Sequence, residues 1–237
     1  MFNIRTLFNI FIFTGLAFAI SSCSKLDDDY SNSGDLTDAA AVGIVHASAG
    51  SPSLDVALDD NRLGLNYFNY TDRVSYFRAY TGTRNFNVYA AGYLTSVLYT
   101  KSLVFEAGKY YTVFIVDTAS KMDAVLVRDS SGAAGQDSVR LRFANMSPDA
   151  PALDLYIKGN ATPIATNITA KTAGNFFSYP SAANVVFEIR RTGQSVLLAT
   201  ADAMNLYKGN FYTIWCGGYI NGSDAAGTGL RIDAFIH

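Results

Sequence analysis

The chain has 237 residues, of which 49% are hydrophobic and 14% aromatic, enough apolar material for one or two folded cores. Its 18 basic and 20 acidic side chains give a net charge of -2. Nucleic-acid binding needs clustered Lys and Arg, so this balance argues against a nucleic-acid partner.

Residues 1–22 have the three parts of a secretory signal peptide. Arg5 supplies the positive charge, an apolar run covers residues 7–20, and small residues precede Cys23. The run is too short to span a bilayer, which needs about 20 apolar residues. The ending Ile20-Ser21-Ser22-Cys23 is typical of a bacterial lipoprotein, so we expect lipid on Cys23 to hold the protein on a membrane. An ordinary secretory signal is the alternative.

Residues 23–41 are predicted to be the lipidated Cys followed by an acidic, flexible tether. Asp, Ser, Asn and Gly dominate this segment, which is too polar to bury a core. Residues 24–29 resemble the acidic export signal of Bacteroides-type lipoproteins. We therefore expect an outer-membrane protein that faces the outside of the cell. The alternative is the periplasmic face, with the acidic residues serving only as a solvated tether.

The remaining chain repeats itself once. Residues 51–58 match residues 150–157, residues 108–115 match 209–216, and residues 122–126 match 232–236. Ordered matches of this kind are typical of a tandem duplication. We therefore predict one unit over residues 42–128 and a second over 139–237. The small, polar residues 129–138 are predicted to be the linker.

Each unit is predicted to be a β-sandwich. Apolar residues alternate with other residues, as at Leu153, Leu155 and Ile157, which is the period of a half-buried strand. Val, Tyr, Phe, Thr and Ile are frequent, and turn residues recur about every 8 to 12 positions. The fold class is therefore all-β, with two tandem antiparallel sandwiches of Ig-like architecture. A barrel is the alternative.

The second unit carries a distinctive segment, Ser147-Pro148-Asp149-Ala150-Pro151, followed by Ala152-Leu153-Asp154-Leu155-Tyr156 and preceded by residues 140–145. In these residues it resembles the bacterial family called domain of unknown function 4397. The first unit departs from the motif, because Ala49-Gly50-Ser51 replaces its Pro-Asp-Ala core. The resemblance implies extracytoplasmic β-sandwich modules, often on lipoproteins. It implies no activity, so no catalytic residue is assigned.

No catalytic, cofactor or metal site is expected from the motifs. His46 and His237 have no second His or Cys at metal-ligand spacing. Asp55 and Asp154 follow Pro-containing loops, where a carboxylate commonly binds its own turn. The alternative for these two carboxylates is a ligand or calcium site. Cys216 is expected to be buried and inert, because its counterpart in the first unit is apolar.

Two regions differ between the units and form the candidate binding surface. Residues 66–70 add the rings of Tyr67, Phe68 and Tyr70, which suit stacking on sugars or on a protein partner. The alternative is that this aromatic strand packs in the core. The connection over residues 217–229 is longer than its counterpart and contains Tyr219. Such an extension is either a recognition loop or neutral drift.

Asp117-Thr118-Ala119 and Asp137-Ser138-Val139 resemble the O-glycosylation motif of Bacteroides-type exported proteins, so Thr118 and Ser138 are candidate modification sites. The leading prediction for the whole chain is a surface lipoprotein that acts as a non-catalytic binding or adhesion module for a glycan or a protein. A structural or envelope-assembly component is the first alternative. A carbohydrate-active enzyme is the second, since paired carboxylates would meet only in the folded protein.

Overall fold

The computed structural model describes residues 36–237 except 66, 94, 131, 133–134 and 136. The predicted signal peptide, Cys23 and most of the predicted tether therefore lie outside the described residues. Every regular secondary-structure element in the described part of the chain is a β-strand, so the all-β prediction is confirmed. No helix among these residues is long and apolar enough to cross a membrane.

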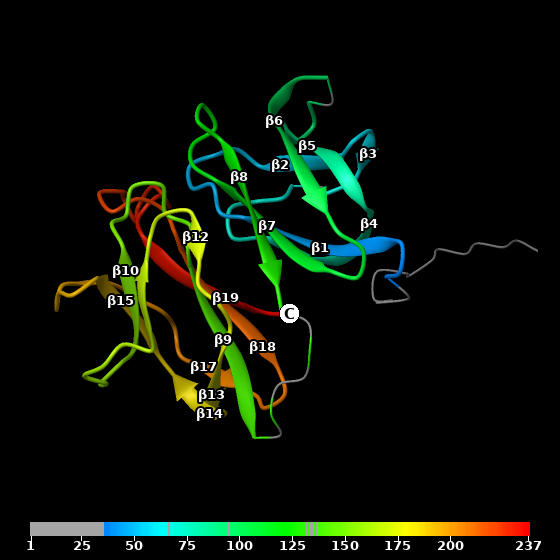
Figure 1. The fold of residues 1–237 in the computed structure, drawn as a ribbon. Coiled ribbons are helices and arrows are strands. Elements are labelled where there is room, and N and C mark those ends of the chain that lie inside the picture. The colour runs from blue at the N-terminus through cyan, green and yellow to red at the C-terminus, as the bar shows by residue number, and fades with distance from the viewer. Residues whose placement is uncertain (1–35, 66, 94, 131, 133–134, 136) are drawn as a thin grey trace, which may run out of the picture.

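Strands β1 to β8 form the N-terminal half, residues 36–130 (Figure 1). Sheet A has the order β4-β1-β7-β8, and sheet B has the order β3-β2-β5-β6. Their bounds are β1 Ala39–His46, β2 Leu54–Leu58, β3 Asn61–Arg62, β4 Arg73–Tyr80, β5 Gly82–Ala90, β6 Val97–Phe105, β7 Tyr110–Val116 and β8 Asp123–Asp129.

Strands β9 to β19 form the C-terminal half, residues 138–237. Sheet C has the order β12-β9-β18-β19, with β13 also paired to β9, and sheet D has the order β11-β10-β15-β16. The two short strands β14 and β17 pair with each other. The bounds are β9 Ser138–Asn145, β10 Leu153–Ile157, β11 Ala165–Ile168, β12 Thr172–Ala173, β13 Phe177–Pro180, β14 Ala182–Val185, β15 Phe187–Arg191, β16 Leu197–Thr200, β17 Met204–Leu206, β18 Phe211–Gly217 and β19 Arg231–Ile236.

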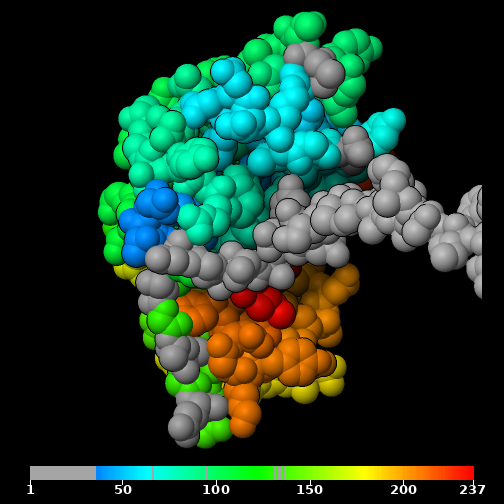
Figure 2. Space-filling model, turned by 90° about the vertical axis from the view of Figure 1, so that its right-hand side faces the viewer, coloured from blue at the N-terminus to red at the C-terminus, as the bar shows by residue number. Residues whose placement is uncertain are grey.

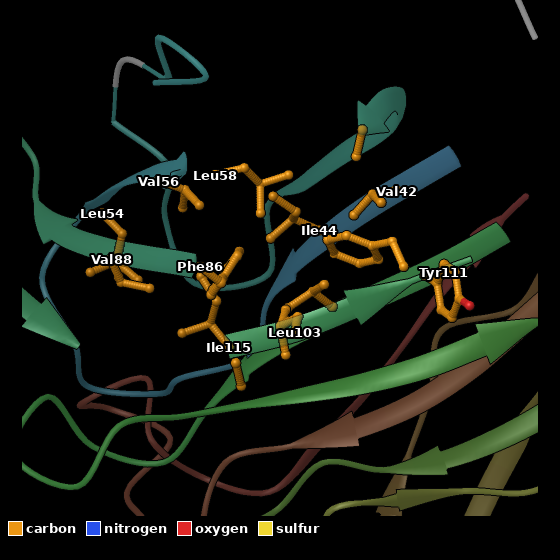
Figure 3. Close-up of a cluster of buried hydrophobic side chains, with 14 of the residues drawn as sticks. Val42, Ile44, Leu54, Val56, Leu58, Phe86, Val88, Leu103, Tyr111 and Ile115 are labelled. Carbon is orange, nitrogen blue, oxygen red and sulfur yellow. The ribbon is translucent and has the colours of Figure 1, made fainter. Parts of the chain in front are cut away.

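Each half has a core between its two sheets. In the N-terminal half, alternate residues of sheet A such as Val42, Ile44 and Ile115 pack with Val56 and Phe86 of sheet B (Figure 3). Sheets C and D of the C-terminal half share a second core in the same way. The period-two alternation predicts these inward positions, because successive side chains of a strand point to opposite faces.

One strand pair in each half is parallel. β1 runs parallel to β7, and β9 runs parallel to β18, in the centre of sheets A and C. In the N-terminal half the chain adds β4 to one side of β1, crosses to sheet B for β5 and β6, and then returns to sheet A, where β7 lies on the other side of β1 in the same direction. The prediction of antiparallel sheets is wrong for these two pairs. Residue alternation identifies a strand and its faces, but it says nothing about which strand becomes its neighbour.

The two halves meet through the outer faces of sheets A and C. The junction is filled by seven buried apolar side chains: Val45, Ala47, Phe114, Val116, Ala144, Met146 and Trp215. Figure 2 shows the two halves stacked, with residues at the red end of the chain where they meet. Strands β7 and β18 are therefore buried on both faces. The sequence predicts half-buried strands, because it does not show what covers the outer face.

Candidate functional site

The aromatic residues 67–70 do not form one exposed surface. Tyr67 is 73% exposed, but Phe68 is only 5% exposed and belongs to the core of the N-terminal half. Tyr70 is half-buried, and its ring packs edge-on against Trp215 across the junction with a centroid distance of 6.5 Å. Phe68 and Tyr70 are therefore packing residues, which corrects the predicted aromatic surface. Only Tyr67 is free to contact a partner.

Tyr219 is also half-buried rather than a free anchor. Its hydroxyl oxygen and that of Tyr70 are buried without a hydrogen-bond partner among the described residues. Burial raises the pKa of both tyrosines, and Tyr219 is among the groups that act on Tyr70. The two residues, which come from separate regions of the sequence, therefore lie near each other where the halves meet.

Asp55 and Asp154 are occupied by bonds within their own half. Asp55 accepts a hydrogen bond from the Val56 amide at 2.8 Å and pairs with Arg62 at 2.9 Å. Asp154 accepts three hydrogen bonds, donated by Asn167 N of β11 and by Thr192 Oγ1 and Gly193 N of the turn after β15. These bonds account for both carboxylates as structural groups. The calcium or ligand alternative has no support from this geometry.

The long connection between β18 and β19 folds back on itself and is tied to the rest of the half. The amide of Tyr219 donates to the carbonyl of Thr228 at 2.9 Å. Asp149 Oδ1 accepts hydrogen bonds from the Ile220 amide at 3.0 Å and from Ser147 Oγ at 3.1 Å. The aspartate of the Ser-Pro-Asp segment thus anchors this loop. The first unit has neither the aspartate nor the long loop.

In the N-terminal half, side chains close the open edge between the two sheets. Tyr99 and Lys101 on β6 both donate to Asp123 Oδ1 on β8, at 2.7 and 2.8 Å, and Lys101 also donates to the carbonyl of Ala124. Burial disfavours the charged form of Asp123, yet the bonds from Lys101 and Tyr99 outweigh it and lower the pKa of Asp123. This edge is bridged from sheet B to sheet A.

Strand register shows which residues match this bridge in the C-terminal half. Val56 faces Val88, which faces Tyr99; in the C-terminal half Leu155 faces Ile189, which faces Ala199. In the same way, Lys101 faces Phe86 on β5. Phe187 is the equivalent of Phe86, and its carbonyl accepts a hydrogen bond from the amide of Ala201, so Ala201 matches Lys101. Two alanines thus stand where the N-terminal half has tyrosine and lysine.

The third member of the bridge changes as well. Asp123 pairs with Val116 on β7, whereas Arg231 pairs with Gly217 on β18, so Asp123 matches Arg231. The sequence match of residues 122–126 to 232–236 is therefore out of register by two residues. The sequence match sets Asp123 against Asp233, another aspartate, so it does not show that the bridge is absent from the C-terminal half. These positions are the functional candidates that sequence reasoning missed.

The missing bridge leaves an open groove of about 450 Å³ along this edge. Its walls come from β16 and the residues after it, including Ala199, Ala201 and Asp202, and from the long loop and β19, including Asp224 and Arg231. A smaller hollow of about 200 Å³ continues along β19 and shares Ala201, Asp202 and Arg231 with it. The volume lies within the range of about 300 to 1,000 Å³ typical of ligand sites.

Charged groups and small aliphatic residues line the groove. Arg231 is 53% exposed and lies 3.6 Å from Asp233, while Asp202 and Asp224 are exposed. Leu198 and Ile232, both lining residues, supply apolar surface between them. The site thus offers a guanidinium donor and carboxylate acceptors beside small aliphatic groups, which can hydrogen-bond hydroxyl groups and contact C–H surfaces.

The remaining chemically interesting residues do not line the groove. Burial lowers the pKa of His46 to about 4 and that of His237 to about 3, so both are neutral at pH 7. Cys216 is fully buried, as expected, and burial raises the pKa of its thiol to about 12. No group of three or more His, Cys, Asp or Glu side chains suited to a metal ion occurs in the described part of the chain.

The two candidate O-glycosylation residues lie in different settings. Thr118 is half-buried just after β7, with its hydroxyl 3.2 Å from that of Ser120. Ser138 is the first residue of β9 and is also half-buried. Modification at either residue stays a prediction.

Comparison with known families identifies part of the chain. The family described as "Domain of unknown function (DUF4397)" matches residues 40–156. Over these residues the chain matches the DUF4397 family model. The DUF4397 match covers β1 to β9 and ends inside β10, so it includes Asp55, Asp154 and the Ser-Pro-Asp segment. The predicted resemblance is confirmed there, whereas the Bacteroides-type and lipoprotein features stay predictions.

Other comparisons add little. No curated protein matches the chain. Among solved structures, a similarity was found to the carbohydrate-binding module CBMbc (family CBM26) of Eubacterium rectale Amy13K, determined in complex with maltoheptaose. It covers 84% of this chain and 96% of that chain with 8% sequence identity and a TM-score of 0.25. At that TM-score the similarity supports no conclusion about fold or ligand.

Proposed function

We propose that this protein is a non-catalytic binding module of the cell surface and that the edge groove of its C-terminal half binds a glycan chain. One observation carries the proposal. The groove exists because Ala199 and Ala201 replace the tyrosine and lysine that close the matching edge of the other half. The same strand framework is thus closed in one half and open in the other, next to a loop that only the open half has.

The chemistry of the groove suits a hydroxyl-rich chain. Arg231 can donate to sugar oxygens, and Asp202 and Asp224 can accept from sugar hydroxyls. The alanines and Leu198 provide small apolar contacts for the C–H faces of a sugar ring. Because the groove is open along the edge of the sandwich, a polymer can enter sideways and continue past both ends.

A peptide is the second candidate ligand. Both β16 and β19 are edge strands of their sheets, and an extended peptide can add to such an edge through main-chain hydrogen bonds. Val196 and Leu197, which are 49% and 51% exposed beside β16, would contact its side chains. The two ligands differ in their dependence on charge: a glycan needs Asp202, Asp224 and Arg231, whereas an added strand needs the backbone of β16.

A glycan array probed with residues 24–237 tests the proposal. We expect retention of one class of glycan, and at least about tenfold weaker binding after Asp224→Ala or Arg231→Ala, because each removes a charged hydrogen-bonding group. Arg191→Ala, at a residue of β15 that does not line the groove, is the control and should bind normally. Absence of binding to every glycan, or unchanged binding by both groove variants, contradicts the glycan proposal.

The membrane anchor belongs to the same proposal. Cys23 and residues 24–29 lie outside the described residues, so the support comes from the sequence alone. We expect the mature protein to incorporate a labelled fatty acid and Cys23→Ala to abolish the label. External protease should degrade the protein on intact cells if it faces outward. Replacing Asp27, Asp28 and Asp29 by Asn should then make it protease-resistant, whereas unchanged digestion would show that these residues are only a tether.

A further inference from the structure

The junction between the halves is built from matching positions of the two repeats. The amide of Ser48 donates to His46 Nδ1, and the amide of Ser147 donates to Asn145 Oδ1, both at 3.3 Å. This bond and the strand pairings place His46 of β1 and Asn145 of β9 at equivalent sites. The correspondence extends along both strands, so Val45 matches Ala144 and Ala47 matches Met146.

Equivalent residues also touch each other across the junction. Phe114 of β7 and Trp215 of β18 are equivalent by their strand register, and their ring centroids are 6.1 Å apart. Asp129 pairs with Tyr110, the first residue of β7, and His237 donates its amide to the carbonyl of Phe211, the first residue of β18, so the two are equivalent. Asp129 Oδ2 and His237 Nδ1 lie 3.7 Å apart. Contact between equivalent residues is the mark of an isologous interface, in which the same patch is used twice about a twofold axis.

The aromatic residues around the junction also occupy equivalent positions in the two halves. Tyr76 packs on Tyr110 with a centroid distance of 5.3 Å, and Phe176 packs on Phe211 at 5.4 Å, both edge-on. Tyr76 and Phe176 then both contact the ring of His237 near the axis. The apolar and aromatic part of the junction would therefore accept either half as a partner.

The buried charges break this symmetry. Arg142 and Asp129 form an ion pair at 2.5 Å, and the side chain of each is 1% exposed. Asp129 also accepts hydrogen bonds from Tyr76 at 2.6 Å and Thr112 at 2.7 Å. The residue that matches Arg142 is Gly43, so the C-terminal half supplies the cation that is paired with Asp129. Arg73 of the N-terminal half also acts on Asp129, but its guanidinium donates to the carbonyl of Ile236 instead. The residue that matches Asp129 is His237, so only the N-terminal half supplies the anion.

Pairing of like halves would leave these charges uncompensated. Two N-terminal halves would bring two Asp129 carboxylates together at the axis, with Gly43 in place of each arginine. Two C-terminal halves would bury two Arg142 guanidinium groups, with His237 in place of each carboxylate. Like charges at such distances repel, and a buried charge without its partner is strongly destabilising.

We propose that the buried ion pair of Asp129 and Arg142 determines the specificity of the junction. The outer face of sheet A binds the outer face of sheet C and does not bind a second copy of itself. Because this specificity comes from residues of the two faces and not from the linker, it also applies when the two faces belong to different copies of this chain. The partner that fits the N-terminal face is therefore the C-terminal half of the same or a second molecule.

The test uses the folded protein with a protease site inserted after Gly132, cut after purification, unfolded and refolded. Native mass spectrometry then distinguishes the three possible pairs, because the two fragments differ in mass. We expect complexes of one N-terminal with one C-terminal fragment, and pairs of like fragments below about 1%, since losing a buried partner weakens association by about 100-fold or more.

A double variant tests whether the two buried charges, and not the shape of the apolar surface, determine which halves pair. Asp129→Leu with Arg142→Met removes both charges while keeping apolar volume, so the junction should still pack and like pairs should appear at a level of about 10% or more. Arg140→Met, which removes a neighbouring arginine on the same face of β9, is the matched control and should keep strict unlike pairing. Like pairs among the wild-type fragments, separation into single fragments, or strict unlike pairing by the double variant each overturns the proposal.

Discussion

Phe114 and Trp215 occupy matching positions of β7 and β18 and face each other across the junction, with ring centroids 6.1 Å apart. Both are at most 2% exposed, although each lies on the face of its sheet that points away from its own core. The contact buries both rings between the two halves. It also explains why the outer faces of these strands are apolar.

Trp215→Ala should destabilise the whole protein by about 3 to 5 kcal/mol, because it removes a fully buried ring and leaves a cavity between the halves. Urea unfolding followed by circular dichroism measures this change. Tyr207→Ala, at a ring that is 62% exposed, is the control and should change stability by less than about 0.5 kcal/mol. Equal effects of the two substitutions would mean that the junction contributes little to stability.

Stability should fall as the pH is lowered from 6.5 toward 3. Burial lowers the pKa of His46 to about 4 and that of His237 to about 3 from the ordinary value of 6.5. A base with a lower pKa in the folded state binds fewer protons when folded, so protons favour the unfolded chain between these values. Above about pH 7.5, where the unfolded histidines are also neutral, neither residue contributes appreciable pH dependence. Urea unfolding at several pH values measures the slope.

His46→Asn is the matched variant for this pH dependence. Asn145 occupies the equivalent site and accepts the equivalent bond from Ser147, so asparagine can keep the bond from Ser48 while removing the titration. The variant should lose less stability than the wild type between pH 6.5 and 4. An identical pH profile for both proteins would show that His46 does not titrate in this range.

Lys101→Met should raise the pKa of Asp123 and open the edge of the N-terminal half. The substitution removes the charged hydrogen bond that most lowers this pKa, and partial exposure of the pair limits its loss of stability to about 1 kcal/mol. NMR titration of the Asp123 carboxyl measures the shift. Lys109→Met on the same half should leave the Asp123 pKa unchanged, and an unshifted Asp123 in the Lys101 variant would refute the bridge.

Asp149→Ala should loosen the long loop without unfolding the sandwich. Asp149 Oδ1 accepts hydrogen bonds from the Ile220 amide and Ser147 Oγ, so its loss frees the start of the loop. Hydrogen exchange should become at least about tenfold faster over residues 219–229, with β18 unchanged. Asp202→Ala, which is exposed and does not hold the loop, is the comparison. Uniform acceleration across the C-terminal half would mean that Asp149 supports the core instead.

The sequence predicts much of the fold because local patterns determine it. Alternation identifies inward residues such as Ile44 and Ile115, and the repeated segments place Asp55 and Asp154 at the same site. The parallel neighbours of β7 and β18 depend on long-range chain return, which no local pattern records. The position of Phe68 has a related cause: the sequence leaves both a binding surface and the core open, and the bridge to Leu54 that places the ring in the core is a long-range contact.

The groove was missed because it results from absent side chains. Ala199 and Ala201 carry no chemical signal, and they become informative only when strand register aligns them with Tyr99 and Lys101. The sequence did indicate the long loop beside the groove, through its greater length. What the loop adds to the site, the carboxylate of Asp224 in the same lining as Arg231, follows from the fold alone.

The most direct test of the groove as a ligand site is to transplant the closed edge into it. Ala199→Tyr, Ala201→Lys and Arg231→Asp together reproduce the Tyr99, Lys101 and Asp123 bridge in the C-terminal half. Isothermal titration with a glycan retained on the array should show binding to the wild type, and no measurable binding to this variant at unchanged thermal stability. Wild-type affinity in a folded variant would contradict the assignment of the groove as the binding site.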